Sequence, residues 1–190
     1  MFYLFLILNS YLAFNIYKKY FNINLYIIFG YVILNLITIY YIYNNNIINS
    51  IFFYYILIFL YLSFIIDIKE MWIADLTIIC ILVLNILKVL LNYFFYKKDI
   101  VYEGMLFIII LIILLVILQL ILKKELMGFG DLKLFFVLSI NSYITDTIYL
   151  LMLSSIIGII YYYIFKKQNE FPFGPSIIIA YVVLELINKN

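Results

Sequence analysis

The sequence contains no histidine and no arginine, and it has a single cysteine, Cys80. These absences exclude histidine-based metal sites, zinc sites built from several cysteines, and internal disulfides. Charged residues make up only 12% of the 190 residues, whereas a soluble domain of this size carries about 25%. The net charge of +2 gives no support for nucleic-acid binding.

Apolar residues make up 69% of the chain and the mean hydropathy is +1.20, which together indicate an integral membrane protein. A transmembrane helix needs about 20 apolar residues. Eight apolar segments are candidate spans, some of them shorter than this: Phe2–Tyr17, Leu25–Tyr43, Ile51–Ile66, Leu76–Phe95, Met105–Leu122, Leu132–Ile140, Ile148–Phe165 and Ser176–Ile187. We predict an all-α, polytopic helical bundle of about eight transmembrane segments, with seven as the alternative count because the sixth segment is short.

The connections between these segments are short, so residues 1–190 are predicted to form one membrane-embedded domain. The apolar start Met1–Leu8 has no basic flank and no cleavage signature, and is interpreted as part of a retained first span. With the N-terminus outside the cell, eight of the twelve lysines fall in cytoplasmic connections. This bias agrees with the positive-inside rule. It places the end of the third segment and the start of the sixth on the cytoplasmic side.

A short polar stretch, Met127–Lys133, separates two of the apolar segments and contains Gly128, Gly130 and Asp131. Glycines permit a tight turn and the close approach of another backbone. One interpretation is that Asp131 only caps the helix that follows. A second acid, Asp67, stands at the end of the third apolar segment, on the same predicted face of the membrane as Asp131.

Two carboxylates at one membrane face favour an aspartyl dyad. Close carboxylates cannot both ionise easily, so they share one proton. The ionised member can then take a proton from water while the neutral member donates to a peptide carbonyl. For Asp67 taken alone, a juxtamembrane acid beside Lys69 and Glu70 is the alternative.

Four other features have milder interpretations. Asp75 precedes an apolar helix and is predicted to cap it. Lys133 either tunes the charge of the dyad or extends to lipid headgroups. Pro172 and Pro175 are compatible with a rigid turn entering the last span. Glu185, inside the last apolar segment, is expected to reach the outer interface, with a polar contact inside the bundle as the alternative.

Three of these motifs resemble the type IV prepilin peptidases, membrane aspartyl proteases with a GxGD motif. Gly128, Gly130 and Asp131, followed by Lys133, match the family's GxGD-x-K signature. Asp67 and the segment that continues to Asp75 match its other catalytic segment, although Ala74 stands where the family usually has proline. Pro172, Gly174 and Pro175 resemble its PFGP element. The resemblance is strongest over residues 67–180.

The resemblance implies a multi-pass enzyme of the cytoplasmic membrane, in contact with membrane lipid, whose active site faces the cytoplasm and uses Asp67 and Asp131 without a cofactor. The implied substrate is a prepilin or pseudopilin-like protein with a basic leader and an apolar helix. Many relatives also methylate their product through a large insertion that binds zinc. The corresponding connection here, about Lys18–Asn24, is too short for such a pocket. We therefore expect neither methyltransferase activity nor zinc.

Two rival functions remain open from the residues. One is an intramembrane protease of the presenilin or signal-peptide-peptidase type, which shares the dyad. That type normally has tyrosine where this chain has Ile66, and a PAL element near its end. The other rival is a transporter or non-enzymatic scaffold whose acids line a polar path.

Overall fold

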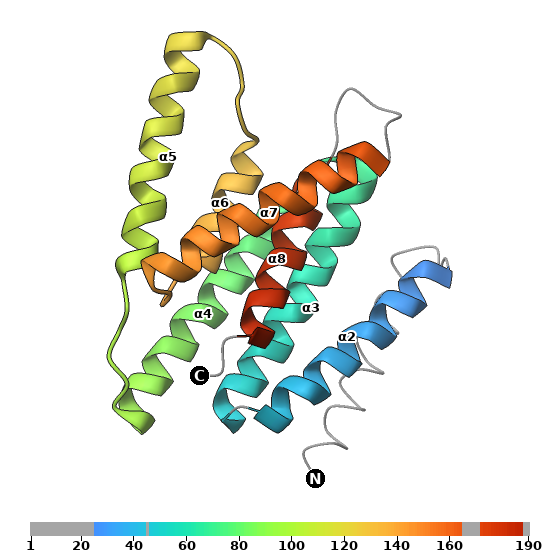
Figure 1. Ribbon diagram of the computed structural model, residues 1–190. Helices are drawn as coiled ribbons and strands as arrows, with labels where there is room; N and C mark the ends of the chain where they lie inside the picture. The colour runs from blue at the N-terminus through green and yellow to red at the C-terminus, as the bar shows by residue number, and fades with distance from the viewer. Residues whose placement is uncertain (1–24, 45, 165–171, 188–190) are drawn as a thin grey trace. The chain divides into compact units, whose positions relative to one another are not determined.

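The computed structural model describes residues 25–44, 46–164 and 172–187, and every regular element in these ranges is an α-helix (Figure 1). The helices are α2 (Leu25–Asn44), α3 (Ile47–Glu70), α4 (Asp75–Tyr96), α5 (Glu103–Leu122), α6 (Phe129–Leu138), α7 (Ile144–Ile164) and α8 (Gly174–Ile187). The prediction of an all-α fold is confirmed.

Four of the described helices, α3, α4, α5 and α7, are long and apolar enough to cross a membrane. Helix α6 has 10 residues and α8 has 14. At 1.5 Å per residue, these two cover roughly 15 and 21 Å, less than the ~30 Å hydrocarbon core. The count of eight spans is therefore not confirmed. The first predicted span, Phe2–Tyr17, lies outside the described residues.

The chain divides into two compact units, Met1–Asn46 and Ile47–Asn190. In the first unit the structure describes α2, in which the Thr38 hydroxyl donates to the Asn35 carbonyl at 2.8 Å. The second unit contains α3 to α8 and all of the predicted site residues.

Helices α3 and α4 form an antiparallel hairpin that is held by polar contacts near both of its ends. Close to the α3–α4 turn, the Ser63 hydroxyl donates to the Thr77 hydroxyl at 2.7 Å. At the other end, the Asn92 side-chain amide donates to Asn49 Oδ1 at 2.7 Å. Such bonds satisfy polar groups that would otherwise be costly to bury among apolar side chains, so they set the register of the hairpin.

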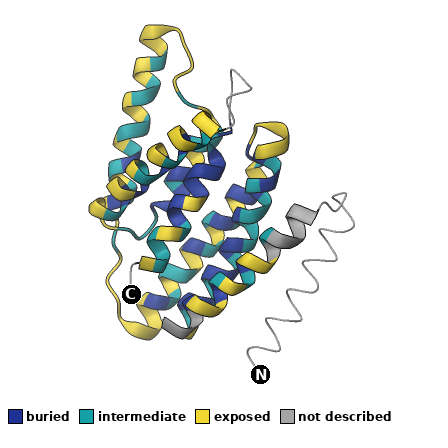
Figure 2. Ribbon diagram, turned by 45° about the vertical axis from the view of Figure 1, so that its right-hand side comes forward, coloured by how far each residue is buried: buried dark blue, intermediate teal, exposed yellow. Residues whose placement is uncertain are grey.

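The remaining helices of the second unit differ sharply in burial. Helix α8 packs against α7, α3 and α6, and α6 also packs against α4 and α5. Buried residues gather where these helices face one another, whereas α5 is covered by exposed and half-buried residues (Figure 2). Only Gly104 and Ile108 of α5 are buried. The apolar surface of α5 is suited to contact with lipid rather than protein.

Candidate active site

Asp67 lies in the last turn of α3, and its side chain is only 4% exposed. It stands one turn beyond Ser63, so both residues share the face of α3 that packs inside the unit. The helix ends three residues later, at Glu70. The next residue, Met71, adopts a left-handed backbone with φ of 55°, and its N–H donates to the Asp67 carbonyl at 2.9 Å. The end of α3 therefore holds Asp67 beneath the α3–α4 turn.

Asp131 is the third residue of the short helix α6 and is half-buried. The helix begins after Gly128, which occupies the N-cap position in an extended conformation, and no side chain caps it. The Asp131 carboxylate makes no hydrogen bond and no ion pair with another described residue. The interpretation of Asp131 as a helix cap is therefore wrong.

The two carboxylates line one pocket of about 340 Å³, together with residues of the α3–α4 turn and of the segment that precedes α6. Asp131 lies outside the four spanning helices. Burial raises its pKa to about 7, and the nearby charge of Asp67 acts in the same direction. The structure thus brings the two acids together, although they are 64 residues apart in the sequence.

Gly174, the first residue of α8, lies against the Asp67 carboxylate. A Cβ at this position would lie 2.5 Å from Asp67 Oδ2, so only glycine leaves room for the carboxylate. The Gly174 backbone N–H also interacts with the Asp67 carboxylate. The free N–H groups at a helix N-terminus favour a negative charge, yet Oδ2 itself has no hydrogen-bond partner among the described residues.

Ile73, in the turn between α3 and α4, links the three segments of the site. It is 6% exposed. A Cβ on Gly130 would meet Ile73 Cβ at 3.3 Å, and a Cβ on Gly174 would meet Ile73 Cδ1 at 3.1 Å. The two glycines of the predicted motifs therefore pack against the same side chain. The sequence analysis missed Ile73, because the turn formed by residues 71–74 is apolar throughout and nothing in its sequence distinguishes this residue.

Asp75 and Lys133 form an ion pair at the rim of the pocket, with Lys133 Nζ donating to Asp75 Oδ1 at 2.6 Å. Asp75 is the first residue of α4, whose N-cap position is held by Ala74, and no side-chain cap hydrogen bond is formed. The prediction that Asp75 caps the helix is therefore wrong. The ion pair supplies another role for both residues, because it joins the starts of α4 and α6.

The segment before α8 forms the turn that was predicted for it, within the described residues that begin at Pro172. Pro172 and Pro175 are buried, and Pro175 occupies the first turn of α8, where its missing N–H is not needed. Phe173 packs against α6 and α7, with its ring 6.4 Å from that of Phe135 and in contact with Gly158. These contacts fix the position of Gly174.

Glu185 lies far from the two aspartates and makes a polar contact inside the bundle. It accepts a hydrogen bond from the Tyr181 hydroxyl at 2.9 Å and lies 3.7 Å from Lys88 Nζ. The expectation that it reaches the outer interface is not met, and the alternative of a contact within the bundle describes the structure.

A model of the type IV leader peptidase family matches residues 54–163, which is more than half of the chain. The match includes Asp67, Asp131 and Lys133, and it ends before Pro172. No curated protein and no solved structure matches the chain. The family to which the motifs pointed is thereby confirmed.

Proposed function

The chain belongs to the type IV leader peptidase family, a family of proteases, and from this premise we propose that it is an aspartyl endopeptidase that removes the leader from prepilin-like proteins. The observation that carries the proposal is the meeting of Asp67 and Asp131 in one pocket, with the pKa of Asp131 at about 7. Neither acid is engaged in an ion pair with another described residue.

In this mechanism the pair carries one proton near neutral pH, held mainly on Asp131. Asp67, beside the N-terminus of α8, acts as the general base and takes a proton from a water molecule in the pocket. Asp131 donates its proton to the carbonyl oxygen of the scissile peptide bond as the water attacks the carbon. The tetrahedral intermediate then collapses, the amine leaves with a proton, and the dyad recovers its single proton. General acid and base catalysis of this kind contributes about 10²–10⁴-fold each.

The rim of the pocket fits a substrate that continues into an apolar helix. Met71, Trp72 and Phe129 all line the pocket and are exposed, with Trp72 at 52% and Phe129 at 61%. These side chains offer an apolar surface beside the two acids. The Trp72 indole N–H donates to the Glu70 carboxylate at 2.5 Å, which orients the ring at the rim. We propose that the apolar segment of a prepilin contacts this surface.

The proposal extends to location: a multi-pass protein of the cytoplasmic membrane with the aspartate pocket on the cytoplasmic side. The four spanning helices support a membrane protein, and the lysine distribution supports this orientation.

The test is cleavage of a purified prepilin-like substrate by the purified chain and by Asp67→Asn and Asp131→Asn. Each substitution retains size but removes the acid, so turnover should fall by at least about 10³-fold, or roughly 4 kcal/mol of barrier. Lys124→Gln, an exposed change in the loop after α5, is the matched control and should cleave normally. A folded Asp131→Asn protein that cleaves at the parental rate would refute the dyad.

A further inference from the structure

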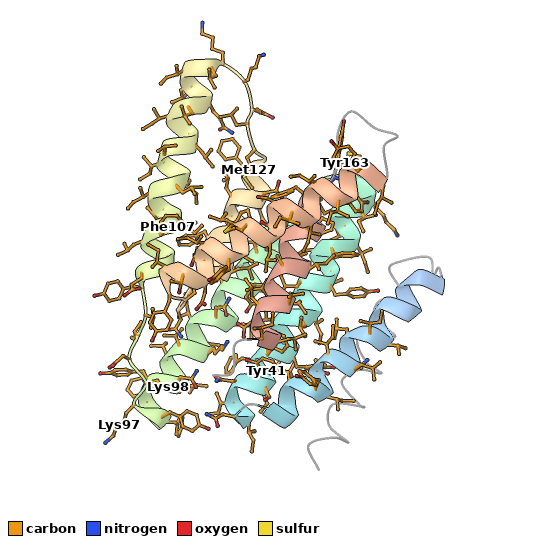
Figure 3. All side chains as sticks on the ribbon, viewed as in Figure 1. Tyr41, Lys97, Lys98, Phe107, Met127 and Tyr163 are labelled. Carbon is orange, nitrogen blue, oxygen red and sulfur yellow. The ribbon has the colours of Figure 1, made fainter. Side chains whose placement is uncertain are left out.

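A second polar pocket, of about 440 Å³, lies between α4, α8 and the turn that joins α6 to α7. Lys97 and Lys98, which line it, lie at the end of α4 that is opposite to Met127 at the start of the aspartate site (Figure 3). The two pockets therefore occupy opposite ends of the second unit and share no residue. The volume of this second pocket is in the range of small-molecule sites, about 300–1,000 Å³.

Two opposite charges face each other within this pocket. Lys88 comes from the middle of the apolar helix α4 and Glu185 from the last turn of α8, and their side chains are only 13% and 16% exposed. Ionisable residues at such positions are costly and usually functional. Helices α4 and α8 hardly pack against each other directly, since each packs against α3 and α6. The two side chains therefore project into a space that other helices enclose.

The ion pair with Glu185 does not supply hydrogen-bond acceptors for the Lys88 ammonium group. Its Nζ lies 3.7 Å from Glu185 Oε1, which is longer than a hydrogen bond, and it makes no other polar contact with a described residue. An ammonium group has three N–H donors. The pocket therefore presents a nearly buried cation whose donors lack acceptors, which suits a ligand with anionic oxygens.

Next to this cation the pocket offers acceptors. Asn92 is 6% exposed and donates through its side-chain amide to Asn49, while its Oδ1 atom is buried without a hydrogen-bond partner. The Glu185 carboxylate adds a negative charge. Three basic and three acidic side chains line the pocket: Lys88, Lys97, Lys98, Asp99, Asp146 and Glu185. This balance suits a ligand that carries both signs better than a simple anion.

We propose that this pocket binds a small zwitterionic group, an ammonium joined to a phosphate or carboxylate, with its anionic oxygens on Lys88 and its ammonium on Glu185. Phosphoethanolamine has this chemistry. It is available either as the headgroup of a membrane phospholipid or as a free compound. The alternative is that Lys88 and Glu185 only brace α4 against α8. A brace would be served as well by apolar residues, because replacing a buried ion pair by apolar side chains is often neutral or stabilising.

The experiment measures binding to the purified full chain in a nonionic detergent by native mass spectrometry and by the shift in unfolding temperature. The four probes are dioleoylphosphatidylethanolamine, free phosphoethanolamine, dioleoylphosphatidylglycerol and dioleoylglycerol. Parental protein is compared with Lys88→Met/Glu185→Leu, which keeps apolar packing, and with Lys124→Met as a matched control outside the pocket. Should the double variant fail to fold, Glu185→Gln keeps the size and the acceptor for Tyr181 and supports the same comparison.

We expect saturable binding of phosphoethanolamine, of its lipid, or of both, reduced at least about tenfold in the double variant and unchanged in Lys124→Met. Binding of the lipid alone identifies the membrane as the source, and binding of the free compound alone identifies a soluble one. The proposal is overturned if neither binds, if phosphatidylglycerol or dioleoylglycerol binds as tightly, or if the double variant binds like the parent.

Discussion

Gly174→Ala tests the site through the contact that holds Asp67. The new Cβ would lie 2.5 Å from Asp67 Oδ2, 3.2 Å from its Cγ and 3.1 Å from Ile73 Cδ1. Ordinary non-bonded contacts between heavy atoms are about 3.5–4.0 Å, so the carboxylate must move by about 1 Å. Asp67 is only 4% exposed, so it cannot turn into solvent to make room.

A displacement of about 1 Å of a reacting group costs on the order of 100-fold in rate, or about 2.7 kcal/mol of barrier. Backbone strain adds nothing to this figure, because no described glycine has a positive φ. The kcat for cleavage of a prepilin-like substrate should therefore fall by about two orders of magnitude. The unfolding temperature should also fall, because adding a methyl group to a tightly packed site typically costs about 1–3 kcal/mol, so kcat is measured well below that temperature.

Gly128→Ala is the matched control. Its Cβ would lie 3.3 Å from Asp131 Oδ2, and Gly128 is exposed, so a small shift relieves the contact. We expect a loss of only a few-fold in kcat. If folded Gly174→Ala protein cleaves as fast as the Gly128→Ala protein, the contact between α8 and Asp67 does not position a catalytic group.

Three further predictions follow from the geometry. Burial and the charge of Asp67 raise the pKa of Asp131 to about 7, so Asp131 loses the proton that it must donate as the pH rises through this value. The value of kcat/KM should therefore fall between about pH 6 and pH 8. A flat pH profile across this range would contradict the role of Asp131 as the acid. The side chains of Lys133 and Asp75 are 52% and 69% exposed, so solvent screening limits the contribution of their ion pair to stability to about 1 kcal/mol or less. A double-mutant cycle of Lys133→Met and Asp75→Asn should measure a coupling in unfolding free energy of this size. A coupling above about 2 kcal/mol would show that the pair is shielded from water. In a Cys80→Ser background, a membrane-impermeant thiol reagent outside intact cells should label a cysteine at Lys98 and miss one at Glu70 or Glu125, and labelling at Glu70 would reverse the proposed orientation.

The sequence alone was sufficient to predict the all-α fold class and to single out Asp67 and Asp131, which line one pocket in the structure. Both predictions depend on local signals. Long apolar runs of spanning length can satisfy their backbone groups in lipid only as helices or closed barrels, and their composition indicates helices. Asp67 and Asp131 stand out because an acid beside such a run is rare and costly. The glycines before Asp131 added a short motif of specific spacing, which the family match includes.

Local sequence signals did not predict the partner of a side chain that could form either a local or a long-range contact. Asp75 has the residue type and position of a helix cap, yet it pairs with Lys133, 58 residues further along the chain. A cap hydrogen bond and an exposed ion pair have similar energies, roughly 1 kcal/mol or less. The choice between them is therefore made by whichever groups the packing of α4 against α6 brings together.

Only the tertiary structure decided which residues surround the acids and which polar residues form a second pocket. Gly174 meets Asp67 across 107 residues of sequence, and Glu185 meets Lys88 across 97. Residues 177–184 of α8 are apolar on every face of the helix, so their pattern does not specify which helix α8 contacts or in which register. That register is set by the packing of Phe173 against Gly158 and Phe135, contacts that exist only once α6, α7 and α8 have come together.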